Sequence, residues 1–234
     1  MKSIKSLFIA ALTFSSVVVS AQTAEEIVAK NISAMGGMEK LKSLNSIKME
    51  GSLSTQGIDI PVTITTLRDK GLRLDLDIMG TAHYQVANTS KGVIFMPMAM
   101  GHTEPQEMSA TEFASAKDQM NLVGTLASYK ENGSKLEYLG IEEANSSPAH
   151  KIKLTKANGD AVTYYIDTKS YFVTKNTVKR EQDGQTMDIE TSFKDYKQNE
   201  QGYWFPYTRT IMSGDIVFSK ISTNIAIDEK LFQP

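Results

Sequence analysis

Three histidines are the residues of this chain best suited to acid–base or metal chemistry, because imidazole titrates near neutral pH and binds metals when neutral. They are His83, His102 and His150, and they are widely spaced along the sequence. No two of them show HxxxH, HExxH or HxxEH spacing, which would place two ligands on one face of a helix. We therefore expect surface histidines on strands or loops, with no metal site and no catalytic residue among them.

Other catalytic patterns are also missing. The chain has no cysteine, which excludes thiol catalysis, thiolate metal ligands and disulfides, and it has neither a GxSxG elbow nor a phosphate-binding glycine loop. Asp75 and Asp77 alternate with Leu74 and Leu76, so the two carboxylates share one strand face. That face is expected to be solvated. We predict no enzyme activity and no cofactor; the alternative is a hydrolase that uses Asp75, Asp77 or His83.

A methionine-rich segment is the most distinctive apolar feature. Met96-Pro97-Met98-Ala99-Met100 precedes a predicted helix that carries Phe113 and Met120. Methionine is unbranched and polarizable, so it suits a cavity that adapts to varied apolar partners, but it also fills cores. The segment therefore has two interpretations, an acyl-chain site or packing beneath a loop. Each methylene moved out of water contributes about 0.8 kcal/mol, so one acyl chain would supply much of the affinity.

The elements that would position these residues are mostly strands. Thr23-Ala24-Glu25-Glu26 and Ser109-Ala110-Thr111-Glu112 are capping boxes that begin two helices. Gly36-Gly37 ends the first helix, and a short helical turn is expected over residues 38–44. From Ser46 onward, apolar and polar residues alternate between hairpin turns. We expect about 11–12 strands and a mostly β (α+β) fold, in which two or three helices cover the concave face of one curved antiparallel sheet.

The N-terminal residues are typical of an export signal. Lys2 and Lys5 precede an apolar run over residues 7–19, and Val19-Ser20-Ala21 provides a small-residue cleavage site. The run is shorter than the roughly 20 residues that span a bilayer, and no second stretch approaches that length. We expect residues 1–21 to be a cleaved signal peptide and residues 22–234 to be a single domain, delivered to the periplasm or beyond and not integral to a membrane.

The charge of this mature chain limits its partners. Loss of two lysines from the 25 basic residues leaves 23 against 27 acidic ones, a net charge of −4 with neutral histidine. This balance provides no bulk attraction for nucleic acid or for an anionic lipid surface. We expect no nucleic-acid partner.

Several short motifs follow one another along nearly all of the mature chain. The earlier ones are Thr23-Ala24-Glu25-Glu26-Ile27-Val28, Met35-Gly36-Gly37-Met38-Glu39-Lys40-Leu41, Glu137-Tyr138-Leu139-Gly140 and Tyr164-Tyr165-Ile166-Asp167. The more specific C-terminal ones are Phe193-Lys194-Asp195-Tyr196, Gly202-Tyr203-Trp204-Phe205-Pro206, Asn224-Ile225-Ala226-Ile227-Asp228 and Leu231-Phe232-Gln233-Pro234. In this order they resemble the LolA-like family of periplasmic lipoprotein carriers, in the version described as outer-membrane lipoprotein-sorting proteins.

The resemblance implies an incomplete antiparallel barrel closed by helices, around an internal hydrophobic cavity. It also implies carriage of acylated lipoprotein or lipid toward the outer membrane, with sorting components of the inner and outer membranes as further partners. The family includes sensor modules that bind lipid or lipoprotein without transporting it, so a non-transporting sensor or scaffold is the alternative. In the best-known members an arginine ties the lid helices shut. No motif matches that arginine to Arg68, Arg73 or any other residue here.

Alternation and helix spacing suggest which residues would line the acyl site. The predicted lining is Leu72, Leu74, Leu76, Phe95, Met98, Phe113 and Met120. In the scaffold alternative, Tyr203 and Trp204 would be exposed to contact a partner. Because large aromatic side chains are mostly buried, a packed pair near the start of a strand is favoured for these two residues.

Overall fold

One antiparallel sheet of 13 strands forms the body of the molecule, in the order β6-β5-β4-β3-β2-β1-β13-β12-β11-β10-β9-β8-β7. The computed structural model describes residues 22–182 and 185–234, without the side chains of 180–185, so the predicted signal peptide over residues 1–21 lies outside the described residues. The strands are β1 Ser46–Thr55, β2 Ile58–Leu67, β3 Gly71–Ile78, β4 Thr81–Asn88, β5 Gly92–Phe95, β6 Gln106–Glu107, β7 Lys135–Ala144, β8 Ser147–Thr155, β9 Ala161–Asp167, β10 Val173–Gln182, β11 Gln185–Gln198, β12 Trp204–Ile211 and β13 Gly214–Thr223. The helices are α1 Ala24–Ala34, α2 Met38–Lys42, α3 Pro97–Met100, α4 Ala110–Met120 and the 3-10 helix η1 Glu229–Phe232.

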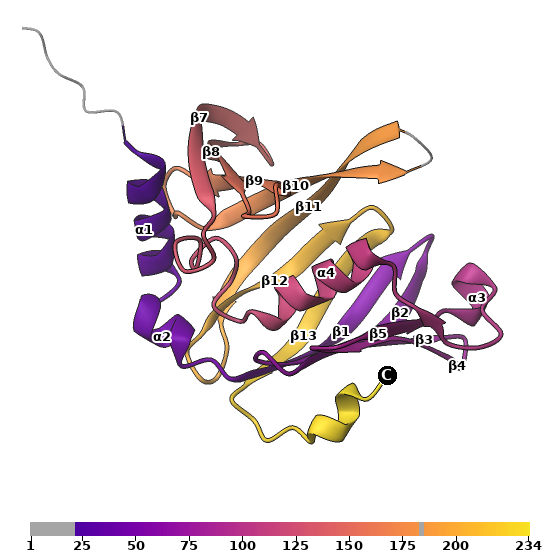
Figure 1. Cartoon of the computed structure of the whole chain (residues 1–234). Coiled ribbons are helices and arrows are strands. Elements are labelled where there is room, and N and C mark those ends of the chain that lie inside the picture. The colour runs from indigo at the N-terminus through magenta and orange to yellow at the C-terminus, as the bar shows by residue number, and fades with distance from the viewer. Residues whose placement is uncertain (1–21, 183–184) are drawn as a thin grey trace, which may run out of the picture.

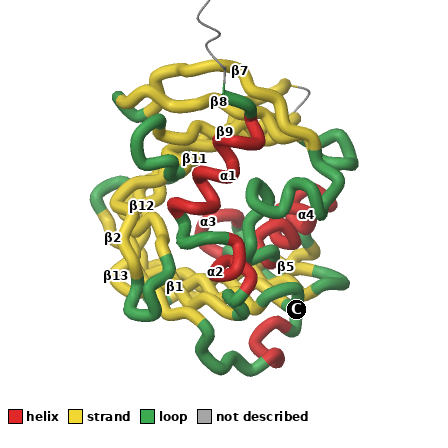
Figure 2. Tube along the Cα trace, turned by 90° about the vertical axis from the view of Figure 1, so that its left-hand side faces the viewer, coloured by secondary structure: helices red, strands yellow, loops and turns green. Residues whose placement is uncertain are grey.

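The topology brings the first and last strands together in the middle of the sheet. Within each half, every strand pairs with its neighbour in sequence, and the halves join because β13 pairs with β1. The edge strands β6 and β7 do not pair with each other, so the sheet stays open. Figure 2 shows it curving around the helices. The predicted mostly β fold with an open, curved antiparallel sheet is confirmed, and the two-residue strand β6 is one strand more than the 11–12 expected.

Both predicted capping boxes are present and begin the two longest helices. Thr23 and Glu26 exchange side-chain to backbone hydrogen bonds at the start of α1, as Ser109 and Glu112 do at the start of α4. Each box satisfies backbone N–H groups that a helix start leaves free. Within residues 22–182 and 185–234, no helix is long and apolar enough to cross a membrane.

The two longest helices lie on the concave face but cover different halves of the sheet. Helix α1 packs its Ala24, Ile27 and Val28 into a cluster with residues of β8 and β9, whereas α4 contacts β2, β3 and β4. Figure 1 shows both helices on the same side of the sheet. Strands β11, β12 and β13 lie between these two covered regions in the order of the sheet.

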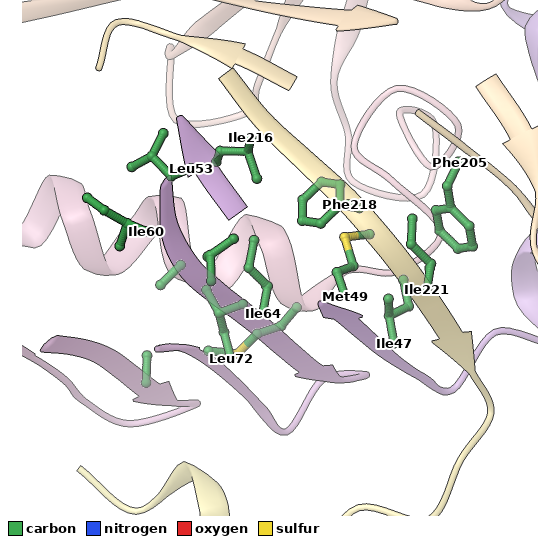
Figure 3. Packing of buried hydrophobic residues seen from close by; sticks show 14 of the residues in the cluster. Ile47, Met49, Leu53, Ile60, Ile64, Leu72, Phe205, Ile216, Phe218 and Ile221 are labelled. Carbon is green, nitrogen blue, oxygen red and sulfur yellow. The ribbon is translucent and has the colours of Figure 1, made fainter. Parts of the chain in front are cut away.

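The larger hydrophobic cluster joins α4 to the centre of the sheet. Alternate residues of β1, β2 and β13 point to this side, as expected for strands with one apolar face. Figure 3 shows Met49 beside Phe218 and Ile221, on the paired strands β1 and β13. The buried members are Leu44, Ile47, Met49, Leu53, Ile60, Val62, Ile64, Leu72, Ala87, Ile94, Met96, Met108, Ala116, Met120, Tyr203, Phe205, Ile216, Phe218 and Ile221.

The C-terminal segment packs against the other side of the sheet. Phe232 of η1 is buried and its ring lies directly against Gly71 at the start of β3. Because Leu72 points to the concave cluster, its neighbour Gly71 faces the opposite side. Figure 1 shows this segment below the sheet, with α4 above it.

Candidate functional site

Five of the seven predicted lining residues come together between α4 and β3. Leu72 is buried, while Leu74 and Leu76 are half-buried against the same cluster. From the helix, Met120 is buried and Phe113 is half-buried against the strands. The described side chains therefore form an apolar contact layer between a helix and the concave face, which is where the sequence predicted an acyl site.

Phe95 and Met98 lie elsewhere, and their predicted placement in the lining is corrected. Phe95 pairs with Tyr84 in the β4–β5 register and its ring packs 5.5 Å from the Tyr84 ring, on the outer face. Its neighbours Ile94 and Met96 point into the cluster instead. A strand changes face at every residue, so an error of one residue in phase moves a side chain across the sheet. Met98 lies on α3 and is 52% exposed.

Helix α4 is held mainly by apolar contacts. Ala116 and Met120 are buried against the sheet. Polar links from this helix include an ion pair between Asp118 and Lys156 and a backbone hydrogen bond of 3.3 Å from the Asp69 N–H to the Met120 carbonyl. The ion pair lies partly in solvent, where such pairs contribute little. Most of the contacts that hold α4 against the sheet are therefore apolar and non-directional.

Two histidines bond to the methionine-rich segment, His83 from strand β4 and His102 from the loop after α3. His83 is 1% exposed; its Nδ1 donates to the Thr81 carbonyl at 2.9 Å, and its Nε2 accepts from the Met98 N–H at 3.1 Å. This pattern assigns the neutral Nδ1–H tautomer. His102 Nδ1 accepts from the Met96 N–H at 3.2 Å. The surface prediction was wrong for His83, because the loop after β5 folds back over it.

His150 is also buried, which again contradicts the surface prediction. It belongs to an aromatic cluster against which α1 packs. Its Nδ1 lies 3.1 Å from the Tyr138 hydroxyl, and its ring stacks on Tyr171 with centroids 6.0 Å apart. From α1, Lys30 donates to the Tyr171 hydroxyl at 3.2 Å and Asn31 donates to the Tyr171 carbonyl at 2.7 Å. Burial lowers the pKa of His150, Lys30 lowers it further, and Asp167 opposes the shift.

This lowered pKa predicts a pH dependence of stability. In the unfolded chain His150 takes up a proton near pH 6.5, whereas the folded protein resists protonation there. The contribution of neutral, buried His150 to the free energy of unfolding is therefore complete above about pH 6.5 and is lost as the pH falls below that value. We expect the free energy of unfolding, measured with urea, to fall between about pH 7.5 and about pH 5.5, and to fall less in His150→Gln. Equal pH dependence in the wild type and in His150→Gln would contradict the assignment.

The two aspartates of β3 have separate structural roles. Asp75 accepts a bidentate pair from Arg73, with Nη2 at 2.8 Å and Nε at 2.9 and 3.0 Å, on the face away from the hydrophobic cluster. Asp77 accepts from the Gly80 N–H at 2.8 Å in the next turn. The described residues contain no group of three or more acidic or histidine side chains placed to hold a metal. Asp75 and Asp77 therefore do not form the pair of carboxylates that the hydrolase alternative would need.

Two hollows lie away from the predicted lining. One of about 540 Å³ lies between the β4–β5 turn and the C-terminal segment, with Lys70, Asn88 and Asp228 in its wall. A second, of about 340 Å³, lies beside the end of α4 around Asp118 and Lys156. Both are lined mainly by polar side chains, unlike the contact layer beneath α4.

An arginine does tie a helix to the sheet, although no motif identified it. Arg68, in the β2–β3 turn, donates to the Lys42 carbonyl at 2.6 Å and to the Leu41 carbonyl at 2.9 Å. These carbonyls end α2, where a cation is also favoured by the partial negative charge of a helix terminus. A contact between a turn and a distant helix leaves no local pattern in the sequence.

Tyr203 and Trp204 are both packed, but against different partners. Tyr203 is buried and its hydroxyl bonds to Ser43 at 2.8 Å and to Asn224 at 2.9 Å. Trp204 is half-buried with its ring centroid 5.2 Å from that of Phe172. Exposure of Tyr203 to a partner is therefore wrong. The two residues do not form an aromatic pair, because Tyr203 packs into the main hydrophobic cluster and Trp204 packs against Phe172.

Comparison with solved structures identifies the class of fold. A domain from Vibrio parahaemolyticus described as an outer membrane lipoprotein-sorting protein aligns over 88% of this chain and 94% of its own, with a TM-score of 0.51 and 16% identity. A LolA superfamily protein from Nitrosomonas europaea aligns over 92% and 99%, with a TM-score of 0.54 and 12% identity. A DUF1329 family protein from Desulfovibrio piger aligns over 88% and 97%, with a TM-score of 0.57 and 9% identity.

These matches show that the chain has a LolA-like fold. No family model matches the sequence, and no curated protein matches it. The likeness is one of architecture, and shared architecture alone does not carry function. What this chain does must be argued from its own concave face.

Proposed function

We propose that this protein is a periplasmic carrier. In this proposal, residues 1–21 are removed on export and residues 22–234 form a single domain that binds an acyl chain of a lipoprotein or lipid beneath α4. The domain then carries the chain toward the outer membrane, with sorting components of the two membranes as donor and acceptor. The observation that best supports the proposal is the apolar layer between α4 and β3, in which Leu74, Leu76 and Phe113 are only half-buried.

The energetics favour an exchange between the helix and a ligand. Helix α4 covers the strands with apolar side chains such as Ala116 and Met120. An acyl chain in the same place would replace those contacts with methylene contacts of about 0.8 kcal/mol each. Because few polar bonds link α4 to the sheet, few would have to break when it moves aside. The helix then acts as a lid whose closed state competes with the ligand.

Native mass spectrometry of the mature protein tests this proposal. The protein would be purified without detergent from its own cell envelope, and bound material would be extracted with organic solvent for identification. A stoichiometric acylated species is the expected result. A clean apo mass, together with no uptake of a fluorescent fatty acid, would contradict carriage.

The alternative is a sensor or scaffold that binds a partner and transports nothing. Exposed apolar side chains at one end of the sheet favour it: Met79 is 86% exposed and Met212 is 80% exposed, and both lie in turns at the end where Ile58 begins β2. Such side chains suit a protein contact. The alternative predicts an empty protein in the extraction experiment and binding that depends on these turns.

A further inference from the structure

Arg209 is a charged residue on the apolar concave face. It lies in β12, where it alternates with Tyr207 and Ile211, and both of these pack against the main hydrophobic cluster. Across the strand pairs it faces Phe193 of β11 and Ile216 of β13. Residues paired across strands share a face, so its side chain points to the same side as the buried Ile216.

The surroundings of the Arg209 guanidinium are apolar. One terminal nitrogen, Nη2, lies 3.8 Å from the Met49 sulfur, and the guanidinium carbon is 5.5 Å from the centroid of the Phe218 ring. Figure 3 shows Met49 and Phe218 in this part of the cluster. Nε is buried without a hydrogen-bond acceptor among the described residues. Burial lowers the pKa of this guanidinium, and Tyr196 opposes the shift.

The chain's other described arginines are used differently. Arg73 is paired bidentately with Asp75, and Arg68 is bonded to two backbone carbonyls. Among the side chains that the structure describes, no aspartate or glutamate forms an ion pair with Arg209. A partly buried cation without an anion is costly, and proteins normally supply a partner. Here the missing partner would have to come from outside the chain.

We infer that Arg209 binds the anionic head group of an amphiphile whose acyl chain lies on the concave face. The inference rests on the proposed acyl-binding function and narrows its ligands to those with a carboxylate or phosphate group. A guanidinium fits both, because its N–H groups form a fork that matches two oxygens of either anion.

Lys197 adds a second positive charge on the same face. It pairs with Phe205 across β11 and β12, and its ammonium lies 5.6 Å from the centroid of the Tyr207 ring. Because Lys197 is exposed, its charge is accessible where Arg209 is partly covered. Lys197 therefore adds an accessible positive charge to the face that holds the partly covered Arg209 guanidinium.

Calorimetric titration of the delipidated mature protein tests the inference with laurate, dodecyl phosphate and the neutral ester methyl laurate. The wild type should bind at least one of the two anions ten or more times as tightly as it binds the ester. Tighter binding of laurate would indicate a fatty acid as the natural source, and tighter binding of dodecyl phosphate would indicate a phospholipid. Arg209→Met should lose this preference while still binding the ester, and Arg209→Lys should keep part of it. Arg73→Met, altered on the outer face, should behave like the wild type.

Each remaining result overturns something specific. If both anions and methyl laurate bind the wild type equally, or if Arg209→Met keeps the preference, the anion site is wrong while acyl binding stands. If no amphiphile binds, the proposed function falls and the anion site falls with it. Thermal unfolding confirms that the variants fold. It also adds a second readout, since the preferred anion should raise the melting temperature of the wild type more than that of Arg209→Met.

Discussion

Replacement of Leu74 by glutamate should lower the affinity for an acyl chain about a hundredfold, which corresponds to roughly 2.8 kcal/mol. Leu74 is half-buried between β3 and α4 and packs against the main hydrophobic cluster. A carboxylate at this position would have to be desolvated when an acyl chain covers it, or it would keep part of the chain in water. The measurement is fluorescence titration with a neutral acyl probe, so that charge repulsion from the probe itself is avoided.

A matched control separates this effect from added charge alone. Met79, just beyond the end of β3, is 86% exposed, so Met79→Glu adds the same charge outside the predicted lining and should bind the probe as the wild type does. Circular dichroism and thermal unfolding establish that both variants are folded. Unchanged binding in folded Leu74→Glu protein would show that the acyl chain does not lie against β3.

Replacement of Gly71 by alanine should destabilise the fold by about 1–3 kcal/mol, the usual cost of overpacking a tight contact. A methyl group at Gly71 would meet three atoms of Phe232 well inside van der Waals distance, including Cδ1 at 2.6 Å. One of the three is the Phe232 Cβ, which rotation of the side chain cannot move away. The C-terminal segment would therefore have to shift from the outer face of the sheet.

A double-mutant cycle tests this cause directly. Phe232→Ala alone should cost about 3–5 kcal/mol, because a fully buried ring is removed. In that background, Gly71→Ala should cost less than in the wild type, since Cγ and Cδ1 of Phe232 are removed while its Cβ remains. Urea unfolding of the four proteins gives the coupling energy, with Leu231→Ala as a control at the more exposed neighbour. Additive effects would mean that Gly71 is needed for a reason other than its contact with Phe232.

Local structure was predictable because its causes are local. The two capping boxes at Thr23 and Ser109 began helices as expected, since the bonds that form them join residues three positions apart. Alternation and turn residues likewise predicted the series of strands, with β6 as the addition. These signals depend on near neighbours and therefore survive without knowledge of the rest of the molecule.

Faces and partners were decided by long-range contacts. Phe95 differs from Ile94 and Met96 by one position, and only the pairing of β4 with β5 shows which of them points inward. His83 and His150 carry polar side chains, which alternation treats as exposed, yet each is buried with hydrogen-bonded partners.

The sequence by itself determined a mostly β chain with two capped helices, an apolar face on β3 and no recognisable catalytic motif. Each of these features follows from residue type and short spacing. The tertiary structure alone decided that β13 pairs with β1, that α4 covers Leu74, and that Arg209 lies unpaired among Met49 and Phe218. The physical reason is that a side chain's burial and charge partners depend on residues that lie far away in the sequence, such as Met49 and Arg209, which are 160 positions apart.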